Sequence, residues 1–171
     1  KLLGGPQAGI LIGKRTLIDR LKRHPLARAI RADKSCLAGL LATLDHYRRG
    51  EAVEKIPVLR MIARSPESLH TTAQSWAAAL GDRATVVTGE STVGGGSLPG
   101  ATLPTHLLAL DVDHPDMLLH DLRQATTPVI ARIAGGRVLL DPRTVLDEQM
   151  TPLLHTLIDM VAKHDSRKNC C

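Results

Sequence analysis

The sequence predicts an α/β protein whose C-terminal part is an α+β sandwich, in which helices cover one side of a sheet. Three observations support this fold class. Apolar residues make up 43% of the 171 residues, enough to bury a core. Short apolar runs alternate with segments of helical periodicity. Gly135-Gly136 separates two such runs, which is typical of a tight hairpin between antiparallel strands.

The first third of the chain is predicted to be mainly helical. After a Gly-Gly-Pro turn, residues 8–12 are expected to form a short buried strand, and residues 14–22 a helix. His24-Pro25 interrupts this helix, because proline disfavours helical geometry in the residue before it. A second helical pattern then continues from Leu26 to about Tyr47. We expect this long helix to connect two domains.

The remainder is predicted to mix helices and strands. Residues 50–55 are expected to be a linker, and residues 56–62 a buried helical turn or strand. The elements expected next are a helix over 66–80 capped by Ser65, strands over 83–88 and 105–112, a helix over 115–124, strands over 128–133 and 137–140, and a helix over 147–164. The predicted domains are therefore residues 1–49 and 50–165, followed by a tail over 166–171.

The formal net charge of +5 arises largely from the first third of the chain. Such a basic segment indicates either an anionic partner or simply a solvated helix face. Aromatic residues are limited to Tyr47 and Trp76, which argues against a surface that stacks on nucleic-acid bases.

Cysteine usage and hydropathy predict a cytoplasmic protein without a membrane span. Cys36 lies in a helical pattern, and Cys170-Cys171 lacks the spacing of a zinc site. The eight histidines are scattered, so no metal site is expected. No apolar run approaches the roughly 20 residues that cross a bilayer.

Three features could take part in chemistry, each with an ordinary alternative. Lys1 precedes a Gly-Gly-Pro turn and is either a surface residue or a Schiff-base lysine. Arg28 and Arg31, spaced to share a helix face, suit a phosphate-like anion or a salt-bridged surface. The segment 94–97 is either a plain loop or a place where backbone amides approach an anion.

Four ordered segments, residues 1–9, 24–34, 56–61 and 90–99, resemble the bacterial selenocysteine synthase family, the L-seryl-tRNA(Sec) selenium transferases. The resemblance implies the C-terminal portion of a fold-type I transferase dependent on pyridoxal 5'-phosphate: the end of the large domain, a linking helix and an α+β small domain. It therefore implies an enzyme.

The same resemblance implies roles for individual residues. The lysine that carries pyridoxal phosphate covalently falls on Lys1, which would also transfer the proton. The arginines similar to those that hold selenophosphate fall on Arg28 and Arg31. Gln7 and the loop containing Gly95 and Ser97 would shape the cleft between domains. Arg132 is a further candidate for binding substrate or anion.

The implied activity is β-replacement on seryl-tRNA(Sec), with selenophosphate as selenium donor and selenocysteinyl-tRNA(Sec) as product. The resemblance also implies a homo-oligomeric full-length enzyme. Because everything before Lys1 is absent, we expect this chain alone to be inactive and to bind the cofactor poorly. Two alternatives remain: another fold-type I pyridoxal-phosphate enzyme, such as an amino-sugar-acid ammonia lyase, and a non-catalytic basic module that binds RNA.

Overall fold

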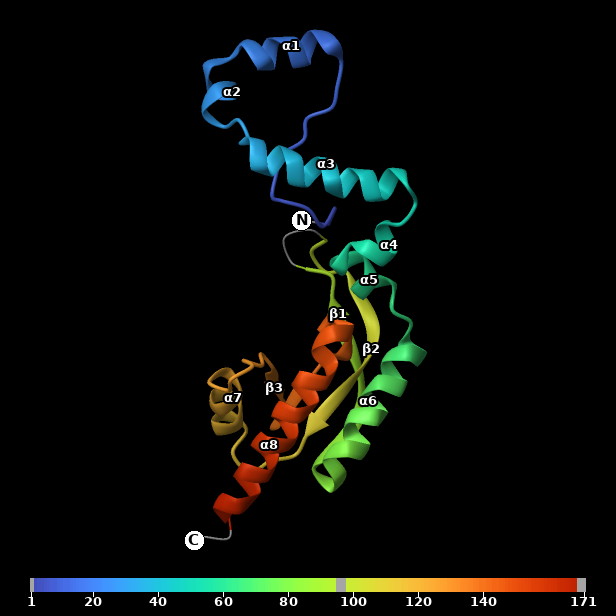
Figure 1. Cartoon of the computed structure of the whole chain (residues 1–171), viewed down its shortest axis with the longest axis vertical. Helices are drawn as coiled ribbons and strands as arrows, with labels where there is room; N and C mark the ends of the chain where they lie inside the picture. Colours follow the sequence, from blue (N-terminus) through green and yellow to red (C-terminus); the bar gives the residue numbers. More distant parts are fainter. Residues whose placement is uncertain (1, 95–97, 169–171) are drawn as a thin grey trace. The chain divides into compact units, whose positions relative to one another are not determined.

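The computed structural model describes residues 2–94 and 98–168 (Figure 1). Contacts divide the chain into two compact units, Lys1–Arg60 and Met61–Cys171, called here the N-terminal and the C-terminal unit. Three predicted site residues, Lys1, Gly95 and Ser97, lie outside the described residues, as does the terminal cysteine pair. Within the described ranges, no helix is both long and apolar enough to span a membrane.

The N-terminal unit is helical, as predicted. The helix expected over 14–22 is confirmed as α1. It ends at His24, whose Nδ1 accepts a hydrogen bond from the backbone N–H of Leu26 at 3.2 Å and so caps the next helix. The helices of this part of the chain are α1 (Arg15–Arg23), α2 (Pro25–Ala29), α3 (Lys34–Arg48), α4 (Ala52–Lys55) and α5 (Pro57–Ala63), of which α5 reaches the boundary between the units.

Three predictions for this unit are wrong. The segment 50–55, expected to be a linker, contains the helix α4. The expected strand over 8–12 is extended but exposed, and no described segment pairs with it, so no ladder forms. The expected helix over 26–47 is broken at residues 30–33. The Asp33 carboxylate accepts a hydrogen bond from the backbone N–H of Cys36 at 2.7 Å, and this cap begins a new helix, α3.

The Gly-Gly-Pro turn lies directly against the helices that follow it. Gly4 has a φ of +84° and no room for a side chain, because a Cβ there would collide with Ile56. A Cβ on Gly5 would lie 2.5 Å from the Thr43 hydroxyl. Pro6 in turn approaches Gly39 in the middle of α3. These close approaches explain the turn sequence.

Apolar side chains of α1, α2 and α3 are largely exposed. None of the three helices contains a buried residue. Leu41 on α3 is 71% exposed and Ile30 is 80% exposed. The N-terminal unit, taken by itself, therefore lacks a hydrophobic core in its first three helices.

The C-terminal unit contains one antiparallel sheet of four strands in the order β1-β2-β4-β3. Its strands are β1 (Ala84–Thr92), β2 (Thr102–Leu110), β3 (Arg132–Ala134) and β4 (Arg137–Leu140), and its α-helices are α6 (Pro66–Leu80), α7 (Pro115–Arg123) and α8 (Met150–Lys168). Short 3-10 turns lie at Gly81–Arg83, Pro142–Thr144 and Asp147–Gln149. All four strands and all three helices were predicted, although some ends differ.

The largest difference concerns the strand expected over 128–133, which is reduced to β3. The backbone N–H of Val129 donates to the Leu122 carbonyl at 2.9 Å, so this segment is tied to the end of α7 instead of to the sheet. Pro128 has no N–H to offer a ladder. β4, by contrast, has the predicted bounds, and Gly135 and Gly136 in its hairpin both have positive φ, at 58° and 73°.

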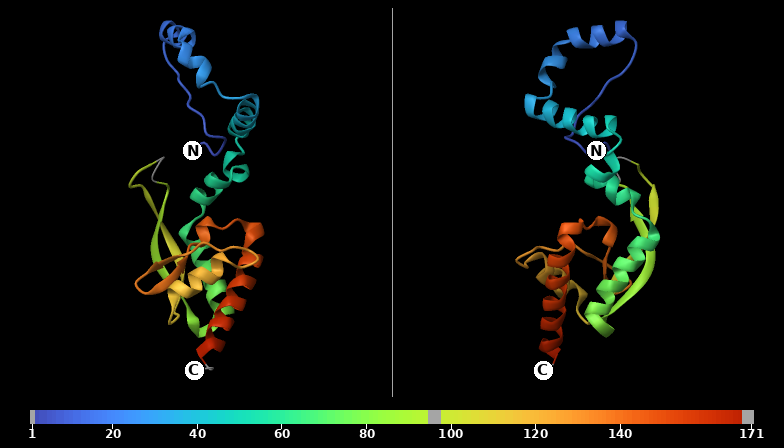
Figure 2. Two further views of the ribbon diagram at one scale, coloured as in Figure 1. Left: turned by 90° about the vertical axis from the view of Figure 1, so that its left-hand side faces the viewer. Right: turned by 45° about the vertical axis from the view of Figure 1, so that its right-hand side comes forward.

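The helices cover one face of the sheet, as predicted (Figure 2). α6 begins as expected, with Pro66 in its first turn and the Ser65 hydroxyl accepting from the Ser68 N–H at 3.3 Å. Leucines from α7 and α8 pack with β2 and β4 in one cluster. Its buried members are Trp76, Ala84, Leu108, Leu110, Val112, Leu118, Leu119, Leu122, Val129, Val138, Leu140, Leu153, Leu157 and Val161.

Candidate functional site

Arg28 and Arg31 do not share a helix face, contrary to the prediction. Arg28 lies in the last turn of α2, whereas Arg31 follows the C-cap residue Ile30 and lies in the break before α3. Both residues are exposed, and within residues 2–94 and 98–168 neither has a hydrogen bond or an ion pair. Two unpaired guanidinium groups close in sequence remain able to bind a tetrahedral anion.

The segment that follows Lys1 is anchored in the N-terminal unit. The Tyr47 hydroxyl donates to the Leu3 carbonyl at 3.1 Å. The Cys36 thiol lies 3.8 Å from the Gln7 carbonyl, as a weak donor. Gln7 is exposed, so its side chain is accessible to a ligand. Together with the tight Gly4 and Gly5 contacts, these bonds fix the path of the chain just after Lys1.

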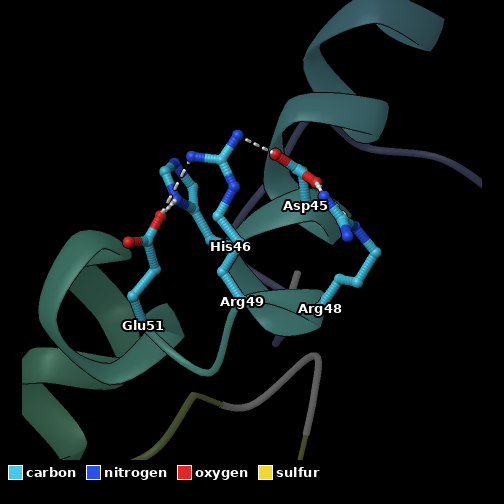
Figure 3. A network of polar contacts seen from close by, with 5 residues as sticks. All are labelled: Asp45, His46, Arg48, Arg49 and Glu51. Carbon is cyan, nitrogen blue, oxygen red and sulfur yellow. Dashed lines mark hydrogen bonds and ion pairs between the residues drawn. The ribbon is translucent and has the colours of Figure 1, made fainter.

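Figure 3 shows a charged network where α3 ends and α4 begins. Asp45 accepts from Arg48 at 2.7 Å and also pairs with Arg49. The hydrogen bond from Arg48 is the main reason that the pKa of Asp45 lies below its usual value. Glu51 accepts from His46 Nδ1 at 2.8 Å, and this bond likewise lowers the pKa of Glu51. These residues pair with one another, so the network joins the end of α3 to the start of α4.

A cavity of about 860 Å³ lies within the C-terminal unit. Its walls come from the end of β1, the segment 127–131, the end of β4 and the start of α8. Arg132 of β3 lines this cavity, is exposed, and has no carboxylate partner among the residues described. Glu90 and Glu148 also line it. The cavity thus offers a guanidinium and carboxylates to a polar ligand.

One buried polar cluster was not anticipated from the sequence. Asp141, at the end of β4, accepts hydrogen bonds from the hydroxyls of Ser91 and Thr105 and from the backbone N–H of Arg143. The Arg143 side chain is buried beside it at 4% exposure. Burial lowers the pKa of Arg143 from its usual value, and the Asp141 charge opposes this shift. In the sequence, Asp-Pro-Arg directly after an apolar run marks a turn, but this pattern does not indicate the distant partners of Arg143.

The candidate residues fall into two groups. Gln7, Arg28 and Arg31 belong to the N-terminal unit, and Arg132 belongs to the C-terminal unit. Across the described ranges, no set of three or more histidine, cysteine, aspartate or glutamate side chains is arranged to hold a metal ion. The described candidates offer the guanidinium groups of Arg28, Arg31 and Arg132 and the amide of Gln7, which can bind anions and polar groups.

Residues 1–146 match the sequence model of a family described as SelA: L-seryl-tRNA selenium transferase. Among curated proteins, the chain is similar to the L-seryl-tRNA(Sec) selenium transferase of Geobacter sulfurreducens, at 43% identity over 171 residues. The corresponding proteins of Geotalea uraniireducens and Aquifex aeolicus are 45% and 39% identical over 169 and 168 residues. These matches cover 95%, 92% and 95% of the chain, but only 37%, 36% and 37% of the respective relatives.

Among solved structures, the chain is similar to D-glucosaminate-6-phosphate ammonia-lyase, with a TM-score of 0.57. The match covers 90% of this chain and 39% of that protein, at 18% sequence identity. At this identity the likeness concerns the fold alone. It agrees with the predicted α/β class.

Proposed function

The chain belongs to the L-seryl-tRNA selenium transferase family, and from this membership we propose that it is part of an enzyme that converts seryl-tRNA(Sec) to selenocysteinyl-tRNA(Sec). The observation that carries the proposal is the match of residues 1–146 to the family model, supported by relatives at 39–45% identity. Because the chain spans about 37% of the length of such relatives, the activity is assigned to a longer protein that contains this segment.

Pyridoxal phosphate is the proposed cofactor, and Lys1 the residue that holds it. The described neighbours of Lys1 fit this role, because Gly4 and Gly5 approach Ile56 and Thr43 too closely for any side chain. This contact fixes the backbone next to Lys1, as a lysine that must stay aligned with a cofactor requires. When bound, the cofactor supplies an electron sink for the α-carbon of the seryl group. The Lys1 Nζ then accepts the α-proton, with Gln7 close in sequence as a cofactor contact.

Arg28 and Arg31 are the proposed ligands of selenophosphate. Their exposure and lack of partners among the described residues support this role, because a guanidinium already paired with a carboxylate would bind the donor less well. Arg132, at the cavity in the C-terminal unit, is proposed to contact the seryl-tRNA substrate or an anion. Gly95 and Ser97, outside the described residues, remain proposed cleft residues on sequence grounds.

The longer protein is further proposed to be a homo-oligomer. Its proposed location is the cytoplasm, where aminoacylated tRNA is available. Residues 1–60 contain 13 lysines and arginines against 5 aspartates and glutamates, so this part of the chain supports contact with the tRNA backbone. The lyase alternative is not favoured, because its support is a likeness at 18% identity. Family membership likewise disfavours a non-catalytic RNA-binding module.

The test uses a full-length protein that contains this segment, supplied with seryl-tRNA(Sec) and selenophosphate. Lys1→Ala is expected to abolish selenium transfer. Arg28→Ala and Arg31→Ala are expected to raise the selenophosphate concentration needed for half-maximal rate by about tenfold or more, the usual scale for losing a charged hydrogen bond. Arg123→Ala, an exposed arginine at the end of α7, serves as the matched control. Unchanged transfer in Lys1→Ala would contradict the proposal.

The 171-residue chain tested alone is expected to show no transfer and no absorbance band of lysine-bound cofactor. A band that appears with pyridoxal phosphate and disappears in Lys1→Ala would show instead that this segment suffices for cofactor binding.

A further inference from the structure

The chain enters the C-terminal unit through the last turn of α5. The final carbonyl groups of any helix have no partner further along it, and α5 ends at Ala63. Arg143, about 80 residues later, supplies the missing donors. Its Nη1 donates to the carbonyls of Met61 at 3.0 Å, Ile62 at 3.2 Å and Arg64 at 2.9 Å. A cation at this end of a helix is also favoured by the helix dipole.

The other nitrogens of Arg143 bind the sheet. Nη2 donates to the Pro104 carbonyl of β2 at 2.7 Å, and Nε donates to the Ser91 hydroxyl of β1 at 3.2 Å. Asp141 accepts hydrogen bonds from the hydroxyls of Ser91 in β1 and Thr105 in β2, and so binds both strands of the β1–β2 hairpin. With donors on all three nitrogens engaged, the guanidinium joins the last turn of α5 to β1 and β2, and is not available to a ligand.

A second arginine makes the same connection in the reverse direction. Arg64 Nη1 donates to the Pro142 carbonyl at 2.7 Å and approaches the Val145 carbonyl at 3.4 Å, on either side of Arg143. Its Nη2 donates to the Thr72 hydroxyl of α6 at 3.2 Å. Each arginine therefore binds the backbone that surrounds the other. We call Arg64 and Arg143 the arginine clasp.

We propose that the arginine clasp is a conformational device that fixes residues 61–64 to the C-terminal unit, so that any rearrangement between the two units occurs on the N-terminal side of Met61. The contact boundary between Arg60 and Met61 agrees with this position, although it falls inside α5. If a continuous helix moved as one piece, the boundary between the two units would be expected at an end of α5. The clasp accounts for the difference, because its hydrogen bonds reach the last turn of α5 at Met61 and Ile62 and the following Arg64. This inference does not depend on the proposed enzyme activity.

The test is hydrogen exchange measured by mass spectrometry on the intact 171-residue chain. Arg143→Lys keeps the charge but cannot reach carbonyls and the Ser91 hydroxyl together. It is expected to raise exchange in residues 61–66 by roughly tenfold, because lost buried hydrogen bonds open the segment locally. Arg64→Lys is expected to do the same to a smaller extent. Residues 107–110 of β2, in the core, should keep their protection in both variants.

Arg137→Lys, a partly buried arginine of the same sheet, is the matched control and should leave residues 61–66 unchanged. Unchanged exchange of residues 61–66 in both clasp variants would overturn the proposal. An equal rise across the whole C-terminal unit would also overturn it, since the arginines would then act on global stability. If Arg143→Lys does not fold, Arg64→Lys decides between these outcomes, and failure of both to fold counts against a local device.

Discussion

Glu51 is held by His46 and Arg49 at the start of α4. His46 Nδ1 lies 2.8 Å from its carboxylate and Arg49 lies 3.8 Å away. The hydrogen bond to His46 is the larger cause of the lowered pKa of Glu51. A carboxyl group with a lowered pKa stabilises the folded state above its unfolded pKa, and this contribution disappears as the pH falls through the folded pKa.

We therefore predict that His46→Ala raises the pKa of Glu51 toward its ordinary value and that the α3–α4 turn opens at a higher pH than in the wild type. Titration of the Glu51 carboxyl carbon by NMR measures the pKa, and the pH dependence of the backbone amide shifts over residues 46–52 measures the opening. Arg60→Ala, outside the network of Figure 3, is the control. A pKa of Glu51 that is the same with and without His46 would contradict this prediction and would assign the shift to the charges of Arg49 and Lys55.

Single residues were the least predictable part of the candidate site. Arg132 was named as a candidate within the strand expected over 128–133, and the structure adds that it lines a cavity. Arg143 was missed, because its partners lie 39 to 82 residues away and none of the local spacings indicates them. Sequence periodicity detects which face of an element is apolar, but it carries no information on which distant carbonyl groups a side chain will meet.

At the scale of elements, the approach of Pro6 to Gly39 limits what α3 can accept. A Cβ on Gly39 would lie 2.7 Å from the Pro6 ring. Alanine would otherwise favour a helix interior over glycine by about 1 kcal/mol. The two effects oppose each other, and a rigid proline ring cannot move aside as a flexible side chain could.

Gly39→Ala is predicted to detach residues 2–13 from α3, while α3 itself remains helical. Limited proteolysis within residues 2–13 should become faster. In a Pro6→Ala background the collision is removed, so Gly39→Ala should leave proteolysis near the level of Pro6→Ala alone. Equal protection of wild type and Gly39→Ala would show that the turn does not pack on α3 as described.

Helices and strands were predicted correctly where capping or turn residues at their ends determine the local backbone. Ser65-Pro66 and Gly135-Gly136 fix their own backbone, and α6 and β4 appeared where expected. The strand over 8–12 and the longer strand over 128–133 failed for a shared reason. An apolar run becomes a strand only if a neighbour offers a ladder, and that neighbour is not a property of the run.

At the scale of the whole molecule, the two units differ in how they are stabilised. The main core cluster lies entirely within residues 61–171, whereas the buried residues described in the N-terminal unit are Ala52 and Ile56. Hydrophobic burial is the dominant favourable term in folding, so the units should differ strongly in independent stability.

A chain of residues 61–171 is predicted to unfold cooperatively on heating, with loss of near-ultraviolet circular dichroism from Trp76. A chain of residues 1–60 is predicted to show a broad, non-cooperative loss of helicity, since short helices without packing are marginal in water. A sharp transition in residues 1–60, or its absence in residues 61–171, would contradict this division.

The arginine clasp also has a kinetic consequence. It joins Arg143 to carbonyls 79 to 82 positions earlier, so its hydrogen bonds close a loop that contains most of the C-terminal unit. Closing a loop of that length costs entropy that nearer contacts, such as the β1–β2 hairpin, do not require. We therefore expect the hairpin and its helices to assemble first and the clasp to close late. Interactions that form late govern how slowly a folded chain opens, so these two arginines determine the lifetime of the folded unit more than the speed of its formation.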